Sequence, residues 1–133
     1  MIYALDTNTV AYALKGEILG HIKDEAANCN DLVIPPIVSY ETKRWLLITK
    51  VTKRQKLFSD LCQNNQIGII DRGVLDEASD IYTSLKLQGR LTDDANILIA
   101  AFCRSHDYTL VTHNLKHFQP ISNLKLVDWK TEN

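Results

Sequence analysis

An acidic side chain stands at the end of the first apolar segment of the chain. The segment begins at Met1 and stops on Asp6, and two more polar side chains, Thr7 and Asn8, follow directly. A strand that is apolar on both faces is usually buried in a parallel sheet. In such sheets, ligands bind beyond the carboxyl ends of the strands. Asp6 is therefore expected at the place where an α/β protein carries out its chemistry.

Three further segments carry oxygen-bearing side chains that can meet Asp6. They lie at expected strand ends or at the starts of helices: Glu41, the pair Asp93 and Asp94, and the group Thr112, His113 and Asn114. Mg²⁺ prefers oxygen ligands, usually one or two carboxylates together with waters and substrate phosphate. A metal held in this way activates water and stabilises charge during phosphodiester cleavage. The residue types thus favour Mg²⁺-dependent phosphodiester chemistry, with Mn²⁺ as an alternative ion.

Alternating strands and helices must position these side chains. Short apolar runs predict strands over residues 2–5, 32–34, 67–70, 109–111 and 124–127. Helical spacing predicts a helix that starts over residues 9–14, with residues 17–27 either continuing it or forming a second helix. It also predicts helices over residues 37–49, 52–64 and 73–88, and from an N-cap at Thr92 to about residue 105. This alternation is typical of a parallel sheet with helices on both faces. We expect an α/β fold, a three-layer sandwich made by one domain over residues 1–133.

Composition limits the class of protein. The chain has 133 residues and a formal net charge of −1, so it has no overall basic bias toward nucleic acid, although a local basic patch would suffice. Cys29, Cys62 and Cys103 form no CxxC pattern, which favours reduced thiols in a cytoplasm. No apolar stretch approaches the roughly 20 residues needed to span a bilayer. We expect a cytoplasmic protein with no membrane partner.

Several motifs together resemble one known family. They are Leu5–Asn8, Ser39–Glu41, Asp93–Ala101, Leu110–Asn114 followed by His117 and Phe118, and Ile121–Trp129. In this order and spacing the chain resembles the PIN-domain ribonucleases of the VapC toxin type. The resemblance implies a PIN-like sandwich and Mg²⁺-dependent endonucleolytic cleavage of RNA, often transfer RNA. It also implies a VapB-like antitoxin that blocks the site, and a homodimer.

One position departs from the pattern of the family. The third acid of the family lies three residues before the Ile of an Ile-Ala-Ala run, where this chain has Asn96. An asparagine offers a metal its carbonyl oxygen but no negative charge. Asp93 lies one turn earlier on the same helix face and is a candidate for the missing charge, whereas Asp94 is about 100° round the helix. A weakened enzyme, an enzyme that relies on Asp93 and a deliberate Asp-to-Asn change are the three open explanations.

The expected site combines these residues in distinct roles. The expected metal ligands are Asp6, Glu41, Asp93 and Asn96, and Asn114 joins them in the catalytic set. Thr7, Asn8 and Thr112 are expected to support and orient the ligands. The acids also have simpler interpretations, as helix caps, dipole partners or solvated charges. We expect His113 to be exposed and His117 to pack with Phe118, because no further ligand completes a zinc site.

A run of basic residues follows Glu41 on two consecutive helices. Its members are Lys43, Arg44, Lys50, Lys53 and Arg54. They form either a solvated surface or a site that gathers RNA phosphates near the metal. The same helices carry apolar residues that the resemblance assigns to antitoxin or protomer docking and that core packing would equally explain: Trp45, Leu46, Leu47, Leu57, Phe58 and Leu61.

Other functions fit parts of the sequence. A PIN fold with Asn96 as its third acid would, if catalytically inactive, act only by binding RNA or antitoxin. Phosphotransferases of the haloacid dehalogenase type also begin with an Asp after the first strand, but they need a second Asp where this chain has Asn8. A dinucleotide-binding fold is disfavoured because no GxGxxG motif follows the first strand.

Overall fold

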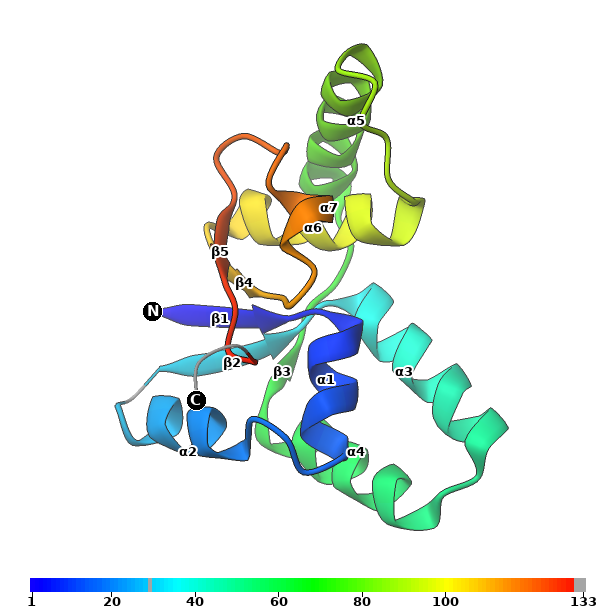
Figure 1. Cartoon of the computed structure of the whole chain (residues 1–133), viewed down its shortest axis with the longest axis vertical. Coiled ribbons are helices and arrows are strands. Elements are labelled where there is room, and N and C mark those ends of the chain that lie inside the picture. Colours follow the sequence, from blue (N-terminus) through cyan, green and yellow to red (C-terminus); the bar gives the residue numbers. More distant parts are fainter. Residues whose placement is uncertain (29, 131–133) are drawn as a thin grey trace.

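A parallel sheet forms the centre of the molecule (Figure 1), seen in a computed structural model that describes residues 1–28 and 30–130. Its strands are β1 (Ile2–Leu5), β2 (Asp31–Ile34), β3 (Gln66–Ile67), β4 (Thr109–Val111) and β5 (Lys125–Val127). Their order is β3-β2-β1-β4-β5, and every neighbouring pair is parallel. The order of the connections reverses between β1 and β4, which makes the carboxyl ends of these two strands the topological switch point.

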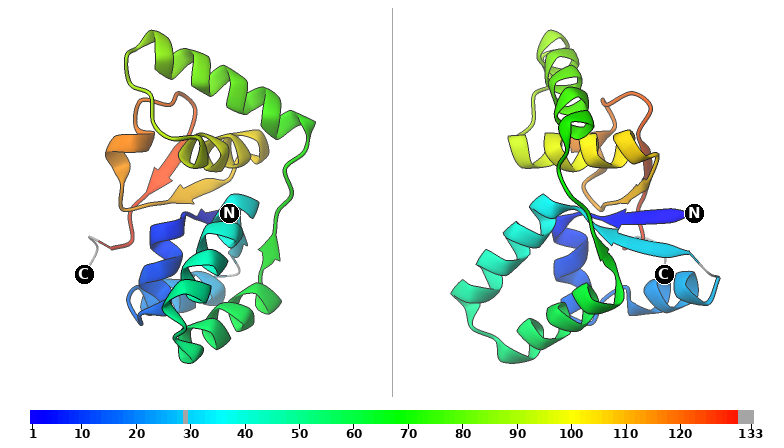
Figure 2. Two further views of the ribbon diagram at one scale, coloured as in Figure 1. Left: turned by 90° about the vertical axis from the view of Figure 1, so that its right-hand side faces the viewer. Right: turned by 180° about the vertical axis from the view of Figure 1, so that it is seen from behind.

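Helices cover both faces of this sheet. One face carries α1 (Thr7–Leu14), α2 (Leu19–Ala27), α3 (Pro36–Thr49) and α4 (Thr52–Asn64) (Figures 1 and 2). The other face carries α5 (Arg72–Leu87), α6 (Asp94–His106) and α7 (Leu115–Phe118). The predicted three-layer α/β sandwich with a parallel sheet is therefore confirmed.

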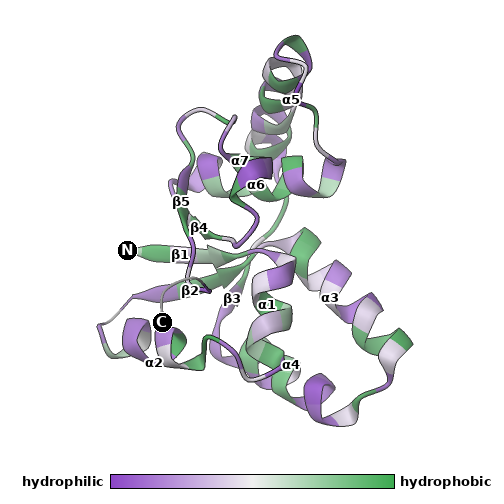
Figure 3. Cartoon of the chain, viewed as in Figure 1, coloured by the Kyte–Doolittle hydropathy of each residue, from purple (hydrophilic) through white to green (hydrophobic). Residues whose placement is uncertain are grey.

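The sheet is buried because its central strands are apolar on both faces. Leu5 of β1 and Leu110 of β4 have no exposed surface, and Figure 3 shows the apolar colouring of the central strands beside helices of mixed colour. The helix α6 packs against α5 and β4 and buries Ile99 and Phe102. Burying a side chain of this size contributes about 1.5–3 kcal/mol to folding. The core thus holds α6, and with it Asn96, firmly against the sheet.

Three predicted boundaries are wrong. The strand predicted over residues 67–70 consists of Gln66–Ile67 alone, and Ile69 and Ile70 beyond it are exposed. The first helix begins at Thr7 instead of Thr9, because the side chain of Asp6 provides its N-cap. The cap of α6 is Asp93, not Thr92, since the carboxylate of Asp93 accepts the hydrogen bond from the N–H of Asn96.

The short helix α7 has no counterpart in the predicted elements, because its four residues are too few to show a helical repeat. It matters because it carries His117. Within residues 1–28 and 30–130, no helix is long and apolar enough to cross a bilayer. Cys62 and Cys103 are free thiols, whereas Cys29 lies outside the described residues.

Candidate active site

Asp6 is fixed at the switch point by backbone and side-chain donors. It follows β1 directly, and its Oδ1 accepts a 2.8 Å hydrogen bond from the backbone N–H of Thr9. The hydroxyl of Thr9 in turn donates to the carbonyl oxygen of Val111 at the end of β4 (3.0 Å). The cap interaction that starts α1 therefore also holds the Asp6 carboxylate between the ends of β1 and β4.

The Asp6 carboxylate is strongly desolvated. Only 5% of the residue is exposed. Burial raises the pKa of Asp6 above its ordinary value of 3.8, an effect that outweighs the hydrogen bonds from Thr112 and Thr9, and the charge of Asp128 raises it further. Among the described residues no cationic side chain forms an ion pair with this carboxylate, so a bound cation would stabilise its ionised form.

Glu41 reaches the same region from α3. The hydroxyl of Thr7, the residue after Asp6, donates a 2.6 Å hydrogen bond to Oε1 of Glu41. The guanidinium of Arg44 lies 3.5 Å from Oε2, at the exposed side of Glu41. Thr7 therefore supports Glu41 rather than Asp6, while Asn8 is exposed. A solvated charge pair was the simpler role considered for Glu41. Glu41 does pair with Arg44, but the pair involves only Oε2.

Thr112 joins Asp6 to Asn114. Its hydroxyl donates a 2.6 Å hydrogen bond to Oδ2 of Asp6 and accepts one from the backbone N–H of Asn114 (3.0 Å). Thr112 has no exposed surface, so water cannot replace these partners. The hydroxyl of Thr112 thus fixes the orientation of the Asp6 carboxylate, and the supporting role of Thr112 in catalysis stays a prediction.

His117 lies between the two asparagines of the site. Its Nδ1 is 3.2 Å from Nδ2 of Asn96 and 3.2 Å from Nδ2 of Asn114. The same Nδ2 of Asn96 donates to the hydroxyl oxygen of Thr92 (3.0 Å). The expectation that His117 packs with Phe118 omitted these polar partners, while Phe118 itself is buried in the core.

The two acids at the start of α6 are placed differently from Asn96. Asp93 is exposed, and its Oδ1 accepts the 2.8 Å hydrogen bond from the N–H of Asn96. Asp94 is exposed in the first turn, where it complements the helix dipole. Across residues 1–28 and 30–130, the structure gathers no group of three or more His, Cys, Asp and Glu side chains that could hold a metal. The carboxylate of Asp93 therefore has a clear role as a cap, and its role as a metal ligand stays a prediction.

The residues brought together nevertheless suit a hard cation. Asp6 directly precedes Thr7, the first residue of α1, and the hydroxyl of Thr7 donates to Glu41 of α3, so Thr7 links the two carboxylates. In the part of the chain that is described, no protein donor is bonded to the side-chain oxygens of Asn96 and Asn114. Mg²⁺ is commonly bound by one or two carboxylates and retains several waters. Two carboxylates supplemented by amide oxygens match that requirement.

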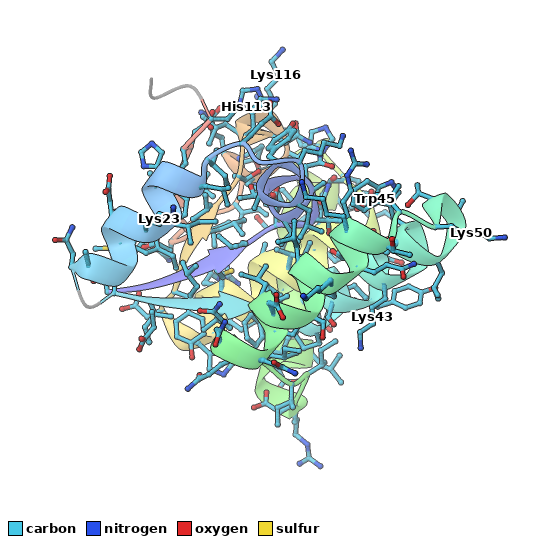
Figure 4. All side chains as sticks on the ribbon, turned by 90° about the horizontal axis from the view of Figure 1, so that it is seen from below. Lys23, Lys43, Trp45, Lys50, His113 and Lys116 are labelled. Carbon is cyan, nitrogen blue, oxygen red and sulfur yellow. The ribbon has the colours of Figure 1, made fainter. Side chains whose placement is uncertain are left out.

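The basic residues lie on the outer surfaces of α3 and α4. Lys43, Arg44, Lys50 and Lys53 are exposed, and Figure 4 shows Lys50 projecting from the edge of the molecule. The guanidinium of Arg54 lies 5.9 Å from the ring centre of Trp45, a cation–π distance. Lys53 and Arg54 also line a groove of about 510 Å³ between α1, α2 and α4. Arg44 reaches the exposed side of Glu41, and the other basic residues form a surface on α3 and α4.

Sequence reasoning missed three contributors to the site. Thr9 binds Asp6 through its N–H, His117 contacts both asparagines, and Asp128 acts on Asp6 through its charge and pairs with His113 (2.9 Å). The Asp-x-x-Thr spacing at residues 6–9 is an N-cap pattern that indicates the first of these. The other two depend on how β5 and α7 pack, for which the sequence offers no local pattern. His113 is exposed as expected.

The sequence of the chain is similar to that of a known family and of individual proteins. The PIN domain family matches residues 3–121 of the chain. Ribonuclease VapC2 of Rickettsia felis is 29% identical over 133 residues, which cover 97% of this chain and 98% of that protein.

Solved structures share the whole fold. The crystal structure of VapBC2 from Rickettsia felis, bound to a DNA fragment from their promoter, contains a similar chain with a TM-score of 0.89 and 28% identity, covering 97% of this chain and 99% of that one. A structure of VapBC-1 from nontypeable Haemophilus influenzae gives a TM-score of 0.85 and 26% identity, over 97% and 98% of the two chains.

Proposed function

The chain belongs to the PIN-domain family, and on this premise we propose that it is a metal-dependent endoribonuclease, the toxin of a toxin–antitoxin pair. The similarity to a protein named Ribonuclease VapC2 extends over nearly the full length of both chains. One observation carries the proposal: the carboxylate of Asp6 is buried at the switch point of the sheet and its pKa is raised, while the neighbouring residue, Thr7, donates a hydrogen bond to Glu41. Such an arrangement is costly unless a cation uses it.

In the proposed mechanism, Asp6 and Glu41 would hold Mg²⁺, or Mn²⁺ in its place, and the amide oxygens of Asn96 and Asn114 would add neutral ligands. When bound, the ion activates water and stabilises the negative charge on the phosphate during cleavage. Thr112 and the N–H of Thr9 keep the Asp6 carboxylate in one orientation. Thr7 does the same for Glu41. Because water attacks directly, the products carry a 5′-phosphate and a 3′-hydroxyl, and the 2′-hydroxyl of the RNA is not needed.

The proposed activity is attenuated at one position. Asn96 supplies an oxygen without charge, so the site holds fewer negative charges than a site with an acid there. Asp93 lies one turn away and adds its charge from the exposed side of the helix, in addition to capping it. An exposed charge at this distance is screened by water and salt and compensates only in part.

For the substrate, we propose RNA and in particular transfer RNA. The exposed cations Lys43, Arg44, Lys50 and Lys53 and the half-buried Arg54 lie on α3 and α4 or, for Lys50, at the C-cap of α3, and α3 also carries Glu41. A backbone held over this surface would lead a phosphate toward Glu41. Weakened binding at higher salt concentration would accompany such a mode of recognition.

For partners, we propose a VapB-like antitoxin and a second copy of the chain. The two similar solved structures are of VapBC complexes. On this chain, Leu47 and Leu57 are exposed, which suits docking, whereas Leu46 and Phe58 on the same helices are buried in the core. The apolar residues of α3 and α4 are thus divided between the core and the surface, with only the exposed ones available to a partner.

The test is cleavage of a pool of total transfer RNA by the parent chain and by Asn96→Asp, with Mg²⁺ and with EDTA. We expect slow cleavage by the parent, faster cleavage by Asn96→Asp, and none by either in EDTA. Asp6→Asn serves as the matched control, since it removes one charge and preserves the side-chain shape. Cleavage by Asp6→Asn at the parent rate would contradict the mechanism, and binding without cleavage by every form would indicate a protein that only binds RNA.

A further inference from the structure

The geometry around α7 leads to an inference that rests on the proposed function. We propose that His117 is a positioning residue that turns the amide oxygens of Asn96 and Asn114 away from its imidazole, leaving both oxygens for the metal. His117 itself does not touch the metal or the substrate in this role. It determines which end of each carboxamide is presented.

The direction of the hydrogen bonds follows from their partners. Nδ1 of His117 lies 3.2 Å from the amide nitrogen of Asn96 and 3.2 Å from that of Asn114. An amide nitrogen can only donate, so in both contacts Nδ1 is the acceptor, and the two N–H groups share its single lone pair. The proposed role requires the tautomer in which Nδ1 of His117 carries no proton.

The amide of Asn96 is oriented at both of its N–H groups. One N–H is directed to Nδ1 of His117, and the other donates to the hydroxyl oxygen of Thr92 at 3.0 Å. The backbone N–H of Asn96 is held by Asp93. The backbone N–H and the side-chain NH₂ group of Asn96 are therefore all engaged, and the side-chain oxygen points away from His117 and Thr92. Among the residues that the structure describes, no donor is bonded to that oxygen.

Asn114 is held by the same imidazole and by Thr112, the residue that also binds the Asp6 carboxylate. Its backbone N–H donates to Thr112, whose own hydroxyl donates to Oδ2 of Asp6. Its amide nitrogen faces His117, and no donor within the described residues is bonded to its side-chain oxygen. A single ring nitrogen thus sets the orientation of two amides that come from α6 and from the loop after β4.

Orientation matters because the two ends of an amide are chemically opposite. The oxygen attracts a cation, whereas the NH₂ group carries partial positive charge and repels it. A carboxylate has two equivalent oxygens and needs no such control. His117 is consequently important because position 96 is an asparagine, and replacing Asn96 by Asp should reduce the importance of His117.

The test uses two substitutions of matched size. His117→Phe keeps a ring but has no acceptor, while His117→Asn has an oxygen close to the position of Nδ1. Mn²⁺ binding, followed by the electron paramagnetic resonance of the free ion, should weaken about tenfold in His117→Phe, the typical loss when a partner that orients a metal ligand is removed. His117→Asn should retain most of the parent affinity. In the Asn96→Asp background, His117→Phe should weaken Mn²⁺ binding clearly less than it does in the parent. General damage to the fold would not produce this non-additivity.

A second readout needs neither cleavage nor metal. Nuclear magnetic resonance of the parent should show Nδ1 of His117 without a proton, and side-chain amide signals of Asn96 and Asn114 that shift in His117→Phe but not in Lys116→Ala. A proton on Nδ1, unchanged amide signals, or parent-like Mn²⁺ affinity in His117→Phe would overturn the inference. If the parent binds no Mn²⁺ at all, the proposed metal-dependent function fails, while the nitrogen and amide signals still decide the role of His117.

Discussion

The hydroxyl of Thr112 donates a 2.6 Å hydrogen bond to Oδ2 of Asp6, although 106 positions separate the two residues in the sequence. Both are buried, one at the end of β1 and the other at the end of β4. The pairing of β1 with β4 therefore determines how the Asp6 carboxylate is oriented. The consequence is that changes at Thr112 should affect both the stability of the fold and the chemistry at Asp6.

Replacing Thr112 by Val tests this link. Valine keeps the shape but removes the donor to Asp6 and the acceptor for the N–H of Asn114. We expect the free energy of unfolding to fall by about 1.5–3 kcal/mol, the range for hydrogen bonds to charged groups. The pKa of Asp6 should rise further, because this hydrogen bond lowers it. Urea unfolding measures the first effect, and Thr112→Ser, which keeps the hydroxyl, should stay close to the parent.

The raised pKa of Asp6 predicts how stability depends on pH. Burial raises the pKa in the folded state above the 3.8 of the unfolded chain, so between these values the folded state binds more protons. The contribution of Asp6 to stability must therefore decrease as the pH rises through that interval, and at neutral pH the ionised group is a burden. Asp6→Asn should be more stable than the parent at pH 7, and this advantage should vanish below the unfolded pKa. Thermal unfolding of both forms between pH 3 and 8 measures it.

Asp6→Asn should lower the rate of RNA cleavage, although it should raise the stability of the fold at pH 7. Asp6→Asn removes the charge proposed to hold the metal, so we expect the rate to fall by more than about 100-fold, beyond the loss from a supporting residue. A variant that is more stable but inactive is the expected pattern for a residue retained for function. A variant that is less stable at pH 7 would show instead that the ionised carboxylate stabilises the fold.

The sheet was predictable because its strands are apolar runs bounded by polar residues. Residues 2–5 and 109–111 match β1 and β4 fully, and the parallel arrangement places Asp6 and Thr112 at one edge. Edge elements were less predictable. β3 is exposed at the rim of the sheet, so its length depends on what packs near Gly68 and not on its own pattern.

The sequence proposed members for the candidate site but could not show how they pair. Residue types at strand ends and helix starts indicated Asp6, Glu41 and Asn114, whereas Asn96 was indicated by the resemblance to the PIN-domain family. Periodicity cannot show that Thr7 donates to Glu41 or that His117 meets both asparagines, because such contacts depend on side-chain directions across different elements. The partner of Asp93 was likewise hidden, since a carboxylate at a helix start can cap the helix or face a ligand.

Glu41 and Asp93 are predicted to differ in their effect on metal binding. Glu41→Gln keeps an oxygen for the hydroxyl of Thr7 but loses the charge, so stability should change by less than about 0.5 kcal/mol, as is usual for substitutions on a surface. Its Mn²⁺ affinity should fall at least about tenfold. Asp93→Asn preserves the cap, because Asn and Asp cap equally well, and its exposed charge is screened. Titration calorimetry should therefore show a smaller loss for Asp93→Asn, and an equal loss would make Asp93 a direct ligand.

Gly68 is predicted to limit how α6 can lie against the sheet. A Cβ atom at this position would lie 2.1 Å from Cζ of Phe102, and that ring is buried in the core. Gly68→Ala should therefore lower the free energy of unfolding by about 1–3 kcal/mol, the cost of overpacking a core. Gly20→Ala is the matched control: no atom lies within 4 Å of its Cβ position in α2, and the change should stabilise the chain by about 0.5–1 kcal/mol. Combining Gly68→Ala with Phe102→Leu should recover part of the loss, and an additive double variant in urea unfolding would show that the contact with Phe102 is not the cause.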